Sequence, residues 1–428
     1  MTTIQKRVVR VLGAVLLSTA ALAGERDAGR RFTWTTESAE AKARLLELQQ
    51  RIESFRFGPD NAELARRIVA ADPAFAMGHY YLYASLPPAE NQAPLDEAVE
   101  LSAAASDGER RFIRAMAGIS NLQTVTDPRV RTAVAELESL AADYPDERLV
   151  QVILGQLYQF TGEAEKARQA FLRSEEIGPS SSRARAFLAN HDLLQGNYAK
   201  ARATFEAIEA SLPGGTAPFA VRYGIAFSHL YERNPDKALE SLRTYLDEYR
   251  GAGLPQNFPE VFIWNSLARI NLENGRLEEA MKAYEKGFES VPGSTLPEDQ
   301  KTIWKGRLMH GRCRVLARMG SHAEAWAEAE KIKAMIEEGG EEGEQFWPMW
   351  HYLAGYLKLE AGDAEAAANH LEKANPDDPF HTLLLGRAYD RLGRKDAAKK
   401  AYEKVLASTN NGLERALAYP EAKEKLAS

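Results

Sequence analysis

The amino-acid sequence predicts an all-α fold built from a long series of short helices. Apolar residues recur at helical spacing in almost every window after Glu37, whereas no convincing run alternates with a period of two. Glycine or proline interrupts these windows at regular intervals. A chain of 428 residues is also longer than one compact core usually supports, which leaves several globular domains or a repeat array with an extended core.

Composition excludes several classes of protein before any motif is considered. The 45% apolar and 27% charged residues are typical of a soluble, folded chain and not of a disordered one. The formal net charge is −7 and there is no long basic tract, so we expect no broad binding to nucleic acid. The single cysteine, Cys313, can form neither an intrachain disulfide nor a cysteine-based metal site, and we expect it to be a buried small side chain.

Residues 1–23 have the three parts of a secretory signal peptide. Lys6, Arg7 and Arg10 form a basic start, an apolar stretch follows from Val11, and Ala21-Leu22-Ala23 matches the small-x-small cleavage pattern. The alternative is an uncleaved membrane anchor, but a spanning helix needs about 20 apolar residues and this stretch is shorter. We therefore predict an exported protein, periplasmic or secreted, with no membrane span after the leader is removed.

Residues 24–147 are expected to form divergent helical repeats. Glu37 to Phe55 has the pattern of an amphipathic helix, and Asp60 or Asn61 can cap a second helix that runs to Ala71. The remaining helices of this part are expected near Ala74–Ser85, Leu95–Ala105, Glu109–Leu122 and Pro128–Ala142.

Residues 148–410 contain an internal repeat. Arg148 and Ser182 begin successive segments 34 residues apart, and both segments carry small, aromatic, glycine and proline residues in the same order. In the first segment these residues are Leu154-Gly155, Tyr158, Gly162, Ala167, Phe171 and Pro179. Further copies begin near residues 219, 261, 306, 348 and 379.

This spacing resembles the tetratricopeptide-repeat (TPR) family, whose unit has large residues at positions 4, 7, 11 and 24 and small residues at 8, 20 and 27. The resemblance implies a right-handed α-solenoid of antiparallel helix pairs, a TPR-like superhelix. It also implies protein–protein interaction, and it implies neither a cofactor nor a metal.

The pattern has a physical reason of its own. Positions 4, 8 and 11 form one stripe on the first helix of a pair, and 20, 24 and 27 form one on the second. A small residue at 8 that faces a small residue at 20 would let the two helices approach closely. Glycine at 15 can adopt the left-handed conformation that ends the first helix.

Three inserted segments separate some copies, namely Gly251–Pro259, Pro292–Pro297 and the acidic run Glu337–Glu344. They are expected as surface insertions between one pair and the next. Residues 411–428 follow the last copy, and Leu413 to Leu426 is expected to form a polar-faced helix that caps the far end of the solenoid.

The search for catalytic or metal-binding motifs finds none of the common ones. Phosphate-binding, dinucleotide-binding, zinc-protease and serine-hydrolase motifs are missing from the sequence. No two of the eight histidines are three to five residues apart, which is the usual spacing for metal ligands on one helix. We therefore expect no catalysis and no cofactor.

Positions 5 and 9 of the first helices are expected to line a concave face and bind a protein or peptide partner. They mix arginine with aromatic residues, and guanidinium–carboxylate contacts and aromatic faces suit an extended peptide with acidic groups. The alternative is that the arginines are solvated or pair with nearby acids. The candidate residues are Arg269, Arg314, Arg387, His310, Asn190, Asn265, Tyr223, Phe227, Tyr352 and Tyr356.

The leading interpretation is an exported TPR scaffold without catalytic activity. One alternative is a helical-toroid hydrolase, in which carboxylates at helix ends flank a sugar. The other is a structural envelope protein that associates with itself through an exposed apolar end. The sequence does not identify the partner or the oligomeric state.

Overall fold

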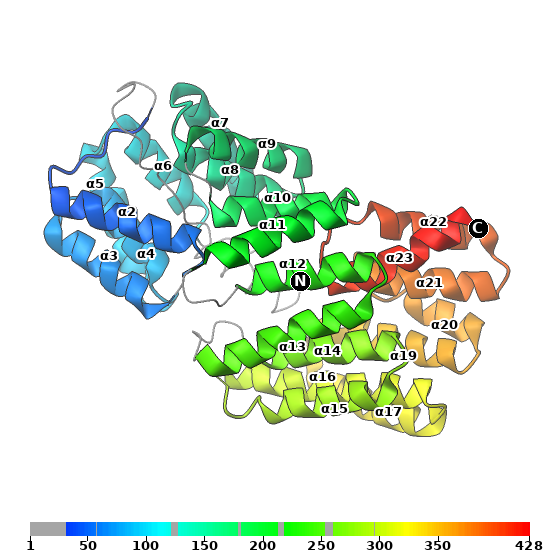
Figure 1. Ribbon diagram of the computed structural model, residues 1–428. Helices are drawn as coiled ribbons and strands as arrows, with labels where there is room; N and C mark the ends of the chain where they lie inside the picture. The colour runs from blue at the N-terminus through cyan, green and yellow to red at the C-terminus, as the bar shows by residue number, and fades with distance from the viewer. Residues whose placement is uncertain are drawn as a thin grey trace. The chain divides into compact units, whose positions relative to one another are not determined.

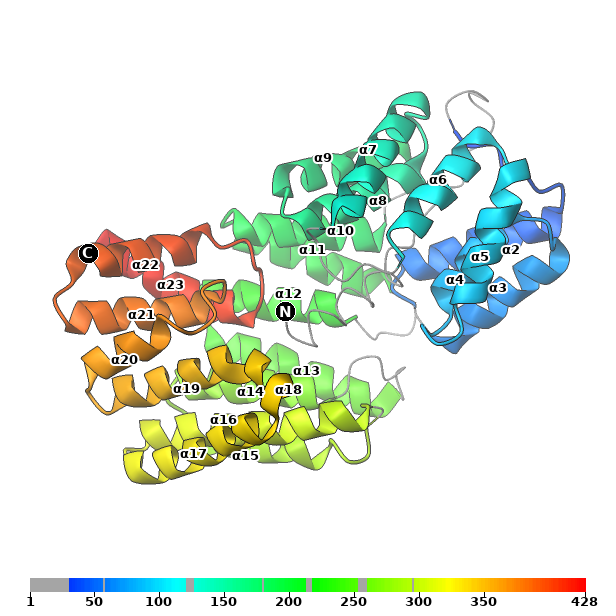
Figure 2. The ribbon, with the colours of Figure 1, turned by 180° about the vertical axis from the view of Figure 1, so that it is seen from behind.

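The computed structural model describes residues 31–56, 58–120, 127–178, 181–212, 218–252, 260–294 and 296–428 (Figures 1 and 2). These residues are helical and contain no strand, which confirms the all-α class and the α-solenoid. They divide into two compact units, residues 1–191 (unit 1) and 192–428 (unit 2). The division falls within α10 (Ser182–Leu194), and the expected leader 1–23 lies outside the described residues.

Unit 1 begins with the helices that the sequence predicts, with ends shifted by a few residues. The second helix differs in its cap. It starts at Pro59 after Gly58, without a side-chain cap, whereas the Asn61 amide donates to the Arg56 carbonyl at 2.8 Å. The expected caps at Asp60 and Asn61 were therefore wrong, because proline suits the first helical position, where no N–H is needed. The helices are α2 (Ala39–Glu53), α3 (Pro59–Ala71), α4 (Ala76–Ser85), α5 (Gln92–Leu101), α6 (Asp107–Gly118), α7 (Pro128–Asp143), α8 (Arg148–Thr161), α9 (Ala164–Ile177) and the start of α10.

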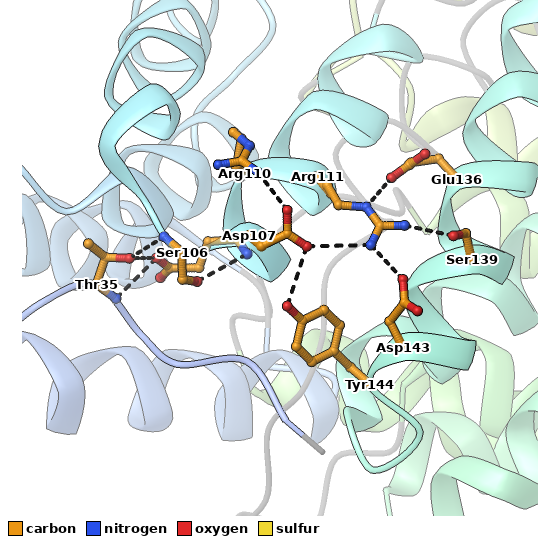
Figure 3. Close-up of polar contacts among 10 residues, drawn as sticks. Thr35, Ser106, Asp107, Arg110, Arg111, Glu136, Ser139, Asp143 and Tyr144 are labelled. Atoms are coloured by element: carbon orange, nitrogen blue, oxygen red, sulfur yellow. Dashed lines mark hydrogen bonds and ion pairs between the residues drawn. The ribbon is translucent and has the colours of Figure 1, made fainter. Parts of the chain in front are cut away.

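Residues 32–36, which we call the N-terminal strap, are fastened to buried carboxylates of unit 1. The Thr35 amide donates to Glu109 Oε2 at 3.0 Å, and the Thr35 hydroxyl accepts from the Ser106 amide at 2.8 Å (Figure 3). The Phe32 amide donates to Glu147 Oε2 at 3.1 Å. The strap therefore supplies donors to Glu109 and Glu147, two carboxylates that are buried in the interior.

A single arginine joins the two helices next to the strap. Arg111 on α6 donates to three side chains of α7, at 2.5 Å to Glu136, 2.7 Å to Asp143 and 2.8 Å to Ser139 (Figure 3). The carboxylates hold the Arg111 pKa above its usual range. The arrangement fixes the α6–α7 register in unit 1.

Unit 2 is a series of antiparallel helix pairs in which each pair packs on the next. Except for α16, which starts earlier than expected, the first helices begin within one residue of the repeat starts. The run Glu337–Glu344 is not a loop, since it completes α17 and forms the turn α18. The helices are the end of α10, α11 (Tyr198–Ser211), α12 (Phe219–Tyr231), α13 (Pro235–Ala252), α14 (Val261–Glu273), α15 (Leu277–Glu289), α16 (Glu298–Arg318), α17 (His322–Glu338), α18 (Gly340–Gly343), α19 (Trp347–Glu360), α20 (Ala364–Leu371), α21 (Pro379–Arg391), α22 (Lys395–Ala407) and α23 (Leu413–Ala427).

The turn between the two helices of a pair uses a left-handed residue, as predicted. Glycine occupies this place in six copies with φ between 71° and 86°. These glycines are Gly162, Gly196, Gly275, Gly320, Gly362 and Gly393. The copy that begins with α12 is the exception, because Arg233 holds the same place at φ 58°.

The glycines at position 8 make the close approach within a pair, but with a different partner from the expected one. A Cβ on Gly155 would lie 2.7 Å from the Phe171 ring, and one on Gly386 would lie 2.5 Å from the Tyr402 ring. The nearest neighbour is thus the large residue at position 24, and not the small residue at position 20. The aromatic ring packs against the first helix at the glycine, where there is no side chain.

Replacing Gly386 with alanine should lower the free energy of unfolding by about 1–3 kcal/mol, because the buried Tyr402 ring has no space to retreat. The matched control is Gly306→Ala in α16, where an added Cβ meets nothing within 4 Å. That change should be neutral or stabilising by up to about 1 kcal/mol. Urea unfolding of both variants measures the difference, and equal effects would contradict the packing role of Gly386.

Unit 1 should lose stability as pH rises from about 5 to 7. Burial raises the pKa of Glu147 from 4.5 to about 7, so the folded chain binds a proton that the unfolded chain has released. The loss is at most about 3 kcal/mol for this group, and it is complete about one pH unit above the folded-state pKa. Glu147→Gln should flatten the slope without abolishing it, because burial also raises the pKa of Glu53 to about 7.

Thermal unfolding across this pH range measures the effect, with exposed Glu176→Gln as the control that keeps the wild-type slope. An unchanged slope in Glu147→Gln would show that this carboxyl does not retain its proton on folding.

Candidate functional site: the inner face of unit 2

We define the inner face as the surface formed by the first helices of the pairs in unit 2, α12, α14, α16, α19 and α21. Nine of the ten candidate partner-binding residues lie on these helices. The tenth, Asn190, belongs to unit 1, where its amide donates to the Ala186 carbonyl at 3.0 Å.

Two arginines and two tyrosines form a buried cluster that joins four helices. Arg269 of α14 and Arg314 of α16 both donate to the Tyr352 hydroxyl of α19, at 2.9 and 3.0 Å. Arg314 also donates to the Tyr284 hydroxyl of α15 at 2.9 Å. We call these four residues the arginine–tyrosine cluster; the sequence had placed Arg269, Arg314 and Tyr352 on one face, and the structure brings them into contact.

Aromatic rings and neutral histidines surround this cluster. The Arg269 guanidinium lies 4.6 Å from the centre of the Phe380 ring, and His381 stacks on Tyr352 with ring centres 3.9 Å apart. Burial and, after it, the Arg269 charge lower the pKa of His381 to about 3. Burial and the two arginines also hold the pKa of His310 well below its usual value, so both histidines are neutral at pH 7.

Positive charge in the cluster is only partly balanced. The nearest carboxylate to Arg269 is Glu273, one helical turn along α14, at 3.9 Å. Among the described residues, Arg269 Nε and Nη2 and His310 Nε2 have no hydrogen-bond partner. A buried guanidinium with unfilled donors gains from any additional negative charge nearby.

The structure corrects the expectation that these residues are exposed on a groove. The arginine–tyrosine cluster and His310 are buried between successive helices, and Tyr356 is buried on α19. Tyr223 and Phe227 are buried on α12, where the Tyr223 hydroxyl lies 2.9 Å from Ser266 Oγ of α14. Positions 5 and 9 therefore pack neighbouring pairs together. Asn265 and Arg387 remain half-buried.

The C-terminal helix lies against the inner face. α23 packs on α21 and α22, as an end cap would, but it also contacts α12 and α14 near the start of unit 2 (Figures 1 and 2). At its beginning, Arg415 donates to the Tyr231 hydroxyl at 2.8 Å, and that hydroxyl donates to Asn411 Oδ1 at 2.8 Å. α23 thus connects the pair α12–α13 with the last pair of unit 2, which an end cap alone would not do.

Carboxylates of α23 meet arginines of the inner face. Arg387 of α21 makes a two-pronged contact with Glu421, with Nε–Oε1 at 2.7 Å and Nη2–Oε2 at 2.5 Å. Arg233, after α12, pairs with Glu424 and donates to the Pro420 carbonyl at 3.0 Å. The Arg233–Glu424 pair is more than half exposed, so it contributes no more than about 1 kcal/mol.

The negative charge of Glu414, in the first turn of α23, acts on buried groups of the inner face. Burial lowers the pKa of the Arg307 guanidinium, and the negative charge of Glu414 opposes that shift. The same carboxylate acts in the same direction on His381. Glu414 therefore supplies part of the negative charge that the arginine–tyrosine cluster lacks.

A cavity of about 760 Å³ remains beside α23. Its walls include Arg233, Glu273, Phe380 and Arg387 of the solenoid together with Glu421 of α23. The helix therefore occupies the inner face without filling it.

Sequence reasoning missed Arg233, Arg415, Glu421 and Glu424. One signal was visible, because Arg233 stands where the other copies have glycine. A left-handed conformation costs a non-glycine residue roughly 1–2 kcal/mol. The contacts of α23 had no local signal, since they join different parts of the array: Arg387 and Glu421 are 34 residues apart, and Arg233 and Glu424 are 191 residues apart.

Comparison with known families identifies the same repeat that the helix pattern indicates. One tetratricopeptide-repeat profile matches residues 154–216 and 223–294, and a second tetratricopeptide-repeat profile matches residues 358–418. Residues 154–216, 223–294 and 358–418 are tetratricopeptide repeats. The matched residues include TPR pairs from both units, and such repeats support a role as a protein-interaction scaffold.

Several solved TPR-type structures are similar in fold. A tetratricopeptide repeat protein from Parabacteroides merdae is 15% identical, with 69% of this chain and 98% of that chain covered and a TM-score of 0.47. The type IV pilus biogenesis factor PilW is 18% identical, with 56% and 97% covered and a TM-score of 0.42. Yeast Tom70 is 10% identical, with 91% and 89% covered and a TM-score of 0.43. These similarities concern the fold alone.

No curated protein matches the sequence. Within the described ranges, no helix combines the length and apolar character that crossing a membrane requires. The same part of the chain holds no group of three or more histidine, cysteine, aspartate or glutamate side chains placed to bind a metal ion. Cys313 is fully buried, and burial raises its pKa to about 12.

Tyr352→Phe should destabilise unit 2 by about 2–4 kcal/mol. The change removes one hydroxyl that accepts from both Arg269 and Arg314 and leaves two charged donors buried without it. The control is Tyr389→Phe, which removes an exposed hydroxyl bonded to Glu372 and should cost less than about 1 kcal/mol. Urea unfolding compares the two, and similar losses would mean that the cluster is not a structural centre.

Proposed function

We propose that the chain is an exported TPR scaffold that binds a protein or peptide partner on the inner face of unit 2, without catalysing a reaction. The observation that carries the proposal is the seating of α23. This face holds a helix through arginine–carboxylate contacts, and a cavity remains beside it. A surface that can hold one helix of its own chain has the chemistry to hold a segment of another.

Export is proposed from the leader alone. Residues 1–23 combine a basic start, an apolar stretch and a small-x-small cleavage pattern, and Gly24 would be the first residue of the mature chain. The N-terminal strap begins soon afterwards, so removing the leader would leave the donors to Glu109 and Glu147 in place.

The candidate residues have two roles in this proposal. Arg387 and Asn265 are half-buried and would contact the partner directly, with Arg233 as an addition. The others on the inner face would shape the surface and supply positive charge from beneath it. These supporting residues are Arg269, Arg314, His310, Tyr223, Phe227, Tyr352 and Tyr356. Asn190 would belong to a separate contact on unit 1.

Site-specific photo-cross-linking in producing cells tests the proposal. A benzoylphenylalanine at Asn274, an exposed residue at the cavity, should give a discrete adduct with one other protein. The same group at Lys399, exposed on α22, should not give that adduct. Mass spectrometry identifies the linked chain and shows whether residues 1–23 have been removed.

Identical adducts from both positions, or none from Asn274, would contradict partner binding on the inner face. An adduct of the chain with itself would favour self-association instead. A retained leader on a chain that stays inside the cell would contradict export.

A further inference from the structure

The contacts of α23 define what the inner face recognises. Three glutamates of this helix, Glu414, Glu421 and Glu424, are seven and three residues apart and therefore lie along one side of it. Glu421 pairs with Arg387 and Glu424 pairs with Arg233, while the negative charge of Glu414 acts on the Arg307 guanidinium. The solenoid thus presents a row of cations at the spacing of helix turns.

Most of the fully buried apolar side chains of α23 are small, and Leu417 and Leu426 are partly buried against the same core. Leu413 is the largest fully apolar side chain that α23 buries, and the others are Ala416, Ala418 and Ala422. Alanine buries little area, so it contributes far less to docking than leucine or phenylalanine would. Pro420 lies inside the helix and removes one of its own hydrogen bonds. These features limit the apolar contribution to the docking of α23.

The side chains of α23 leave part of the inner face unfilled. The cavity of about 760 Å³ is bordered by Arg233 and Arg387, the same arginines that hold the helix, and by Leu230 and Phe380. A helix with the same row of carboxylates but with larger side chains could fill this volume. It would bury more area than α23 at the same site.

Backbone conformation at Arg233 is an independent observation. This residue adopts φ 58° in the one copy whose turn lacks glycine, and its side chain contacts both Glu424 and the Pro420 carbonyl. Glycine would form the turn without strain but could not hold α23. The departure from the repeat pattern therefore falls at a contact with the C-terminal helix.

We infer that the inner face of unit 2 is a receptor for an amphipathic helix that carries a row of carboxylates, and that α23 is its built-in competitor. The partner displaces α23 and takes over the arginine contacts. This inference rests on the proposed scaffold function and specifies the partner class and the regulation of the same face.

The test uses the full chain with Glu421→Arg and Glu424→Arg, which place like charges opposite Arg387 and Arg233. The matched control is Asp396→Arg with Glu403→Arg, the same change in charge at exposed positions of α22. Hydrogen–deuterium exchange reports on residues 413–427, and fluorescence anisotropy measures binding of a labelled peptide with the sequence of residues 411–428.

In the variant, we expect amides of α23 to exchange at least about tenfold faster and the peptide to bind at least about tenfold more tightly than to wild type. The control should behave as wild type does. A peptide with Glu421→Gln and Glu424→Gln should lose the gain. An α23 that stays protected, or a released α23 with no gain in peptide binding, would overturn the inference.

A variant with the two charges exchanged distinguishes release of α23 from general unfolding. Arg387→Glu combined with Glu421→Arg restores opposite charges, so protection of α23 should return towards the wild-type level. If protection does not return, the Arg387–Glu421 contact does not hold the helix and the inference fails. The cross-link at Asn274 distinguishes the scaffold function from the helix receptor. If the peptide does not displace a partner that is cross-linked there, the scaffold function stands and the helix receptor is contradicted.

Discussion

The close approach of two helices at a glycine is the constraint on which the rest of the solenoid depends. At Gly155 and Gly386 the first helix has no side chain, and an aromatic ring of the second helix takes that place. The two helices of the pair therefore pack closely, and their other large side chains pack against the neighbouring pairs. One such layer cannot bury its apolar residues alone, so each pair must stack on the next. The left-handed residues between the two helices reverse the chain in a tight turn, so the second helix can pack closely on the first.

Local features of this design could be predicted from the sequence, and non-local ones could not. The turn glycines and the helix ends follow from spacing, because each depends on residues within one repeat. The burial of Arg269 and Tyr352 could not be foreseen, since spacing places them on a stripe without saying whether another helix covers that stripe. The seat of α23 was hidden for a similar reason. A polar helix at the end of a repeat array suggests a cap, and only the fold brings Glu424 to Arg233.

Charge has a different role inside unit 2 from its role on the surface. Arg269 and Arg314 share one tyrosine hydroxyl and have few carboxylates near them. Their charge is compensated mainly by hydroxyl dipoles, by the Phe380 ring and by acids at a distance. The interior of the inner face is therefore electropositive although the whole chain is acidic. Carboxylates that approach this face are attracted by groups they do not touch.

The bridge that α23 makes between α12 and α21 changes how unit 2 should come apart. An open solenoid behaves as a line of nearest neighbours, in which terminal repeats fray before central ones. α23 contacts both α12, near the start of unit 2, and the last pair, so two distant parts of the solenoid are also joined directly. Loosening either terminus then disturbs the opposite one, so unit 2 gains cooperativity that stacking alone would not provide.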